Sequence, residues 1–136
     1  MHNRTLASDY LRRATHRLAA VDVLFGLESW ADVVRESQEV VELALKALLR
    51  FSSIEVPRVH DVGQILRDES ERLPEGIRPH IEEIAATSHS LRRDRELAFY
   101  GSEDLTPSDF YGKQDAELAR AGARRVVEVV TAARNP

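Results

Sequence analysis

The sequence predicts an all-α fold, an antiparallel up-and-down bundle of four long helices plus one short helix. Apolar residues recur at the i, i+3, i+4, i+7 spacing of a helix with one buried face, most clearly in residues 30–48. No alternating run of apolar and polar residues is long enough to predict a strand. Glycine, proline and polar clusters divide the chain into helical segments with short or medium connections, which pack most simply as an antiparallel bundle.

The first two predicted helices carry clear apolar stripes. The first covers Arg4 to Leu27, and its inner side holds Leu6, Tyr10, Leu11, Leu18, Val21 and Phe25. Ser29 is a good N-cap for the second helix, which continues to Phe51. The stripe of the second helix consists of Trp30, Val33, Val34, Val41, Ala44, Leu45 and Leu48. Glu42 and Lys46 lie four residues apart in the favourable acid-first order, which predicts an exposed pair that stabilises this helix.

The third and fourth predicted helices follow from capping and proline signals. Asp61 can cap a short third helix that ends near Leu73, because Pro74 disfavours helix at the residue before it. The fourth helix covers Ile77 to Phe99, and its apolar stripe contains Ile77, Ile81, Ile84, Ala85 and Leu91. The same spacing continues onto Ser88, Arg95 and Ala98.

Arg95 is therefore predicted on the inward side of the fourth helix. A buried arginine is costly unless it has a carboxylate partner, reaches a dimer interface or lines a wet cleft. The alternative is that its long stem brings the guanidinium to the edge of the helix. Periodicity does not separate these two interpretations.

A loop and a fifth helix complete the chain. The loop from Gly101 to Gly112 contains Pro107 and two aromatic residues among polar neighbours. We predict that Phe110 folds back to close the end of the bundle, and the sequence leaves Tyr111 undecided between core and contact surface. The fifth helix covers Lys113 to Ala133 and buries Ala116, Ala119, Ala123, Val126, Val127 and Val130.

Length and composition exclude several classes of protein. A chain of 136 residues is predicted to form one domain, residues 1–136, large enough for a core without disulfides or metals. The absence of cysteine excludes a Cys-ligated zinc site. A net charge of −4 argues against a surface built entirely to hold nucleic acid, although local basic patches remain open. Because no apolar run is long enough for a membrane span or a signal peptide, we expect a soluble cytoplasmic protein.

The fourth helix also carries a basic and aromatic face. His89, Arg93, Glu96 and Tyr100 follow the spacing i, i+4, i+7, i+11, and Arg92 adds a further positive charge. This face could bind phosphate, because arginine presents a planar fork of N–H donors. Periodicity alone favours the simpler interpretation, a solvated helix surface.

Two ordered motifs resemble those of the HEPN domain family. The first is Q-E-V-V-E-L-A-L-K-A-L-L, from Gln38 to Leu49, which resembles the A-Q-Q-A-x-E-x-x-L-K-A-L-L pattern of the family's second helix. The second is V-H-D-V at residues 59–62, after a loop with Pro57, which resembles the family's T-H-D-L. The resemblance extends from about Asp9 to about Ala133.

The resemblance implies a homodimer in which the fourth helix and its arginine line a cleft between two subunits. Small HEPN proteins are commonly encoded with a minimal nucleotidyltransferase in toxin–antitoxin pairs, and many are RNases. The resemblance therefore implies a module that acts on RNA or nucleotides with a nucleotidyltransferase partner. We expect binding at a set of residues on the fourth helix, namely His89, Arg92, Arg93, Arg95, Glu96 and Tyr100.

The chain departs from the motif of the family's ribonucleases, an arginine and a polar residue followed by a histidine. Arg93 and Asp94 match its beginning, but Tyr100 takes the place of the histidine. Metal-independent RNA cleavage requires a group that removes a proton from the ribose 2′-hydroxyl while an arginine stabilises charge on phosphorus. Histidine titrates near neutral pH, whereas a tyrosine in water has a pKa of about 10.

Three hypotheses follow. The first is a HEPN subunit that binds RNA or nucleotide, with weak or absent nuclease activity. The second is an active metal-independent RNA endonuclease in which Tyr100 or His89 replaces the usual histidine, with Arg93 as the catalytic arginine. The third is a structural dimerisation or adaptor bundle.

The remaining histidines predict no metal or cofactor site. His80 and His89 are nine residues apart and do not share a helix face, and His16 has no ligand-spaced partner. His60 is predicted to make a structural hydrogen bond beside the capping residue Asp61. The sequence contains neither a phosphate-cradling glycine motif nor a G-x-S-x-G elbow.

Overall fold

The computed structural model describes residues 2–56, 62–100 and 106–134, with side chains for 4–56, 62–92 and 106–134. Regular structure in these ranges is helical: α1 (His2–Gly26), α2 (Trp30–Phe51), α3 (Val62–Asp68), α4 (Ile81–Tyr100), α5 (Pro107–Phe110) and α6 (Lys113–Arg134). Two 3₁₀ turns, Ser70–Arg72 and Arg78–His80, join α3 to α4. Within the described ranges, no helix combines the length and apolar character that a membrane span requires. The all-α bundle predicted from the sequence is confirmed.

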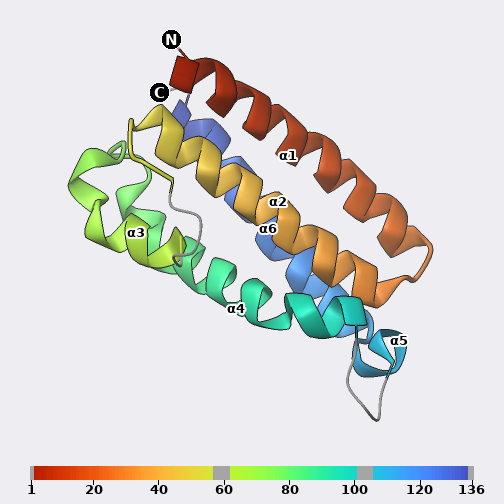
Figure 1. Cartoon of the computed structure of the whole chain (residues 1–136). Coiled ribbons are helices and arrows are strands. Elements are labelled where there is room, and N and C mark those ends of the chain that lie inside the picture. The colour runs from red at the N-terminus through yellow and green to blue at the C-terminus, as the bar shows by residue number, and fades with distance from the viewer. Residues whose placement is uncertain (1, 57–61, 101–105, 135–136) are drawn as a thin grey trace.

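The helix α2 is the centre of the bundle. It packs against α1, α6 and α4, and Figure 1 shows α1 and α4 on opposite sides of it. The predicted stripe of α2 is buried apart from Trp30, which is half-buried. Burial extends to six further residues, Ala31, Ser37, Gln38, Val40, Ala47 and Leu49. The buried arc is wider than one amphipathic stripe because three helices cover α2 instead of one.

Arginines on α1 and α6 join the helices at the surface. Arg17 of α1 pairs with Glu36 of α2 at 2.7 Å. Arg124 of α6 pairs with Asp22 of α1 at 2.9 Å. The prediction that Glu42 and Lys46 form an exposed pair on α2 is wrong. Both side chains are half-buried, and they form no ion pair with each other.

The connection from α3 to α4 is less regular than predicted. The third helix ends at Asp68 and is followed by a 3₁₀ turn, instead of continuing to Leu73. The α-helical part of the fourth begins at Ile81, after a 3₁₀ turn that contains Pro79. Proline is tolerated in a first turn, where its missing N–H has no partner to lose. The predicted cap Asp61 and its neighbour His60 lie outside the described residues.

The described part of the loop after α4 contains a short helix, and its two aromatic residues have different environments. Thr106 caps α5, since its Oγ1 accepts from the N–H of Asp109. Phe110 is 44% exposed, so the prediction that it closes the bundle is wrong. Tyr111, 4% exposed, enters the core instead and touches the Phe110 ring edge-on, with centroids 4.9 Å apart. The chain leaves the helix at Tyr111, which has extended backbone angles, and only the Tyr111 side chain is buried.

Two glycines allow α4 to approach its neighbours closely. A Cβ atom on Gly63 of α3 would lie 3.1 Å from the Cβ and 3.2 Å from the Cα of Ala85. A Cβ atom on Gly122 of α6 would lie 3.0 Å from Cγ2 of Thr87. These contacts place α3 and α6 on two different sides of α4.

The first prediction concerns the contact between α3 and α4. Gly63→Ala is expected to lower the free energy of unfolding by about 1 kcal/mol, because the clash with Ala85 outweighs the better helix propensity of alanine. Gly26→Ala is the control, since Gly26 ends α1 with no atom within 4 Å of an added Cβ. Urea denaturation followed by circular dichroism measures both variants. Equal stability of the two would contradict the close packing of α3 on α4.

Candidate functional site

The neighbours of α4 determine which of its sides is open. Thr87 faces α6, because it meets the position where Gly122 lacks a side chain. Ala85 faces α3 through its contact with Gly63, and Glu82 faces α3 through an ion pair with Arg67. The helix α4 therefore has an α6 side and an α3 side.

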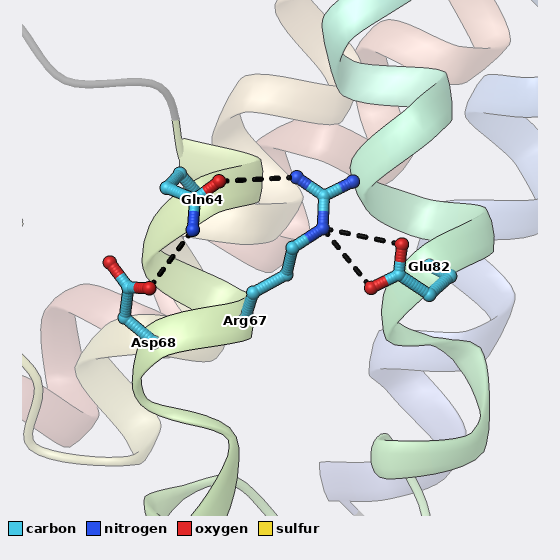
Figure 2. Close-up of polar contacts among 4 residues, drawn as sticks. All are labelled: Gln64, Arg67, Asp68 and Glu82. Carbon is cyan, nitrogen blue, oxygen red and sulfur yellow. Dashed lines mark hydrogen bonds and ion pairs between the residues drawn. The ribbon is translucent and has the colours of Figure 1, made fainter.

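A polar network attaches α3 to α4, as Figure 2 shows. Nε of Arg67 donates to both carboxylate oxygens of Glu82, at 3.1 and 3.3 Å. Nη1 of Arg67 donates to Gln64 Oε1 at 3.5 Å, and Nε2 of Gln64 donates to Asp68 at 2.9 Å. This network and the Gly63 contact fix α3 beside the first half of α4.

His89 and Arg92 extend the α3 side of α4 beyond the end of this contact. His89 lies seven residues after Glu82, and Arg92 lies seven after Ala85, so each pair shares a helix face. Both side chains are exposed. Because Gly63, close to the start of α3, meets Ala85, His89 lies one turn past α3, where α4 is open to solvent.

A charged flank of α2 faces the same direction. Its members follow the spacing i, i+4, i+7, i+11 and are all half-buried: Arg35, Glu39, Glu42 and Lys46. Successive helical residues are rotated by about 100°. Val34 lines a groove between α4 and α6, and Glu36 pairs with Arg17 of α1. The flank therefore lies in the angle between α4 and α1, away from α6.

Together these residues form what we call the polar face. It consists of Arg35, Glu39, Glu42 and Lys46 of α2 with His89 and Arg92 of α4. Guanidinium and ammonium groups can donate to phosphate oxygens, and carboxylates can accept from ribose hydroxyls or base N–H groups. Among the described residues, no three His, Asp or Glu side chains gather in a way that could hold a metal ion.

The other predicted site residues belong to the last turns of α4. Its backbone is helical through Tyr100, so Arg93, Glu96 and Tyr100 follow His89 in one unbroken register. Arg95 occupies the register position seven after Ser88, which is buried as predicted. The side chains of residues 93–100 lie outside the described residues, so these four predictions remain predictions.

Sequence reasoning missed the contribution of α2 to the polar face. The signal was present, since Arg35, Glu39, Glu42 and Lys46 share one helix face. A charged stripe at helical spacing is typical of a solvated surface, and the sequence alone does not show that α4 packs beside it. Half-burial distinguishes this flank from exposed charges such as Arg12, Arg13 and Asp22 of α1.

Comparison with known proteins identifies the family. A family model described as HEPN domain matches residues 7–133. The chain belongs to the HEPN domain family. The fold of this HEPN protein is similar to the crystal structure of TT1696 from Thermus thermophilus, with a TM-score of 0.64 and 22% sequence identity. That similarity covers 93% of this chain and 97% of TT1696, and at this identity it shows the fold alone. No curated protein matches the chain.

The second prediction concerns Gln38 in the family motif. Its side chain is 2% exposed, and Oε1 has no hydrogen-bond partner in the described part of the chain. A buried polar group without a partner destabilises the folded state. Gln38→Met, of similar size, is therefore expected to raise the free energy of unfolding by about 1 kcal/mol in urea denaturation.

The control is Gln114→Met, because Gln114 is exposed in the first turn of α6. Its stability should change by less than about 0.5 kcal/mol. Loss of stability in Gln38→Met would show that the buried amide has a partner, such as an ordered water, and would contradict this account.

Proposed function

We propose that this HEPN protein binds RNA or nucleotide at the polar face and the adjoining end of α4. It does so as a homodimer, with the end of α4 lining the cleft between subunits. The observation that carries the proposal is the exposure of His89 and Arg92 past the end of α3, beside the charged flank of α2. The same helix then continues through Arg93 and Tyr100 without interruption.

The chemistry of the face suits a phosphodiester. Arg92 and Lys46 offer positive charge in a chain whose net charge is −4, so the attraction for phosphate is local. Arg93 and Arg95 would add two guanidinium groups at the end of α4, each able to bind a phosphate with two parallel hydrogen bonds. The aromatic ring of Tyr100 could stack on a base.

Nuclease activity is proposed to be weak or absent. Tyr100 stands where the ribonucleases of the family have histidine, and tyrosine is a poor proton acceptor near neutral pH. The second candidate is an active metal-independent endonuclease. The exposure of His89 next to Arg92 favours it, because His89 could supply the proton transfer from the preceding turn.

We further propose that the partner is a minimal nucleotidyltransferase in a toxin–antitoxin module. This part rests on membership of the HEPN family, in which small stand-alone proteins commonly have such partners. Expression of the chain alone is expected to slow bacterial growth, and co-expression of the nucleotidyltransferase encoded beside it is expected to restore growth. Unchanged growth in both cases would contradict the toxin assignment.

The third prediction tests the site with labelled RNAs of mixed sequence, without metal ions. Arg93→Ala, Arg95→Ala is expected to weaken RNA binding at least tenfold, since removing an arginine that holds a phosphate costs roughly 1 kcal/mol or more. Arg92→Ala is expected to weaken RNA binding and to leave the packing of α4 unchanged, because the Arg92 side chain is exposed. The control is Arg12→Ala, Arg13→Ala, because both arginines are exposed on α1.

Each outcome assigns a function. Binding that depends on Arg92, Arg93 and Arg95 without cleavage supports the binding module. Cleavage that these variants abolish supports the endonuclease, and His89→Ala and Tyr100→Phe then identify the proton-transfer residue. Equal binding by all variants of equal helicity, or no binding at all, would contradict the proposed site and favour a structural bundle.

A further inference from the structure

A cavity of about 550 Å³ lies at one end of the bundle. Its described lining comes from the start of α1, the last residue of α2, the segment before α4 and the end of α6: Arg4, Ser8, Phe51, Pro74, Ala133 and Arg134. Figure 1 shows the start of α1 and the end of α6 together at this end of the bundle, whereas α5 and the end of α4 lie at the other. The cavity has the size of a small-molecule site, and its described lining shares no residue with the polar face.

Two contacts hold the guanidinium of Arg134 at this cavity. Its Nη2 donates to Ser8 Oγ at 3.1 Å. Its Cζ lies over the Phe51 ring, 5.2 Å from the ring centroid, which is within the range of a cation–π interaction. These contacts connect the end of α6 to α1 and α2. They use only part of the guanidinium, which has several further N–H donors that can bind a ligand in the cavity.

A second arginine lines the same cavity. Arg4 lies four residues before Ser8, so the two residues share one side of α1. Neither Arg4 nor Arg134 has a carboxylate partner within the described part of the chain, and the described lining contains no Asp or Glu. Asp9, the first acidic residue of α1, pairs with Arg12 at 2.8 Å instead. The cavity therefore carries two positive charges that no described carboxylate neutralises, and it attracts an anion.

The rest of the described lining is apolar. The Phe51 ring, Pro74 and Ala133 place carbon surface beside the two guanidinium groups. Arginine binds a phosphate group through two parallel hydrogen bonds, and aromatic rings and guanidinium planes pack against flat heterocycles. Inorganic phosphate alone would use only the arginines, and an uncharged heterocycle would use only the apolar wall. The lining therefore fits a ligand that has both parts.

We propose that this cavity binds a small molecule in which a phosphate monoester is attached to a flat heterocycle, as in a nucleoside monophosphate. Arg4 and Arg134 bind the phosphate, and the heterocycle packs on Phe51 and Pro74. Ser8 is a positioning residue, because it holds the guanidinium of Arg134. The inference goes beyond the proposed function, which concerns the polar face.

The fourth prediction tests this cavity by isothermal titration calorimetry with AMP. The original chain is expected to bind AMP. Arg4→Ala and Arg134→Ala are each expected to weaken binding about tenfold, because each removes charge-assisted hydrogen bonds to the phosphate. Arg13→Ala is the matched control, since Arg13 is exposed on α1 and lies outside the cavity. Its affinity for AMP should equal that of the original chain. Circular dichroism verifies that all three variants are folded.

Two comparisons test the two halves of the ligand and the role of Ser8. Adenosine and inorganic phosphate are each expected to bind roughly tenfold more weakly than AMP, because each lacks one of the two contacts. Ser8→Ala is expected to weaken AMP binding about threefold, since Arg134 loses the acceptor that holds it. Ser8→Thr keeps the hydroxyl and should restore the affinity, which a merely structural effect at this position would not do.

Three results would overturn the proposal. The first is no heat of AMP binding at millimolar concentration. The second is unchanged affinity in both Arg4→Ala and Arg134→Ala. The third is inorganic phosphate that binds as tightly as AMP, which would make the cavity a site for an adventitious ion only.

Arg92→Ala separates this inference from the proposed function. AMP binding that Arg92→Ala abolishes and Arg134→Ala leaves intact would assign the nucleotide to the polar face and refute the cavity site. AMP binding that depends on Arg134, in a chain that binds no RNA, would support the cavity site and refute the proposed function.

Discussion

The burial of α2 is the constraint on which the rest of the structure depends. Twelve of its 22 residues are buried, so more than half of its surface must be covered by other helices. α1, α6 and α4 provide this cover, each from a different direction. Burying a charged side chain under these helices would cost desolvation free energy. The charged residues Arg35, Glu39, Glu42 and Lys46 therefore lie on one flank of α2, between α1 and α4.

The position of α4 gives its two open sides different chemistry. Gly63 lets α3 approach the backbone of α4 at Ala85, and Gly122 leaves room on α6 for the side chain of Thr87. On the α3 side the open part of α4 carries His89 and Arg92 and adjoins the charged flank of α2. On the α6 side it adjoins a groove lined by small, apolar and uncharged polar residues together with Asp115, and Leu118 is exposed beside it.

The sequence predicts the helices and the family because both are local properties. Helical periodicity and the two ordered motifs need no knowledge of the neighbours, and the predicted burial of Ser88 and Ile84 is correct for that reason. The predictions of burial are wrong where packing against other parts of the chain determines whether a side chain is exposed. Phe110 and Tyr111 are adjacent and both aromatic, and their local pattern does not distinguish the buried Tyr111 from the exposed Phe110. The half-burial of Glu42 and Lys46 likewise depends on helices far away in the sequence.

The most direct test of the central claim, that the polar face beside α4 is the ligand surface, is photo-cross-linking to RNA that contains 4-thiouridine, followed by peptide mapping. Cross-linked peptides are expected from residues 35–46 of α2 and 89–100 of α4. An excess of unlabelled RNA should abolish the cross-links to both segments. Cross-links confined to the exposed surface of α1, residues 12–23, or to α6 would contradict it, because those surfaces lie outside the polar face.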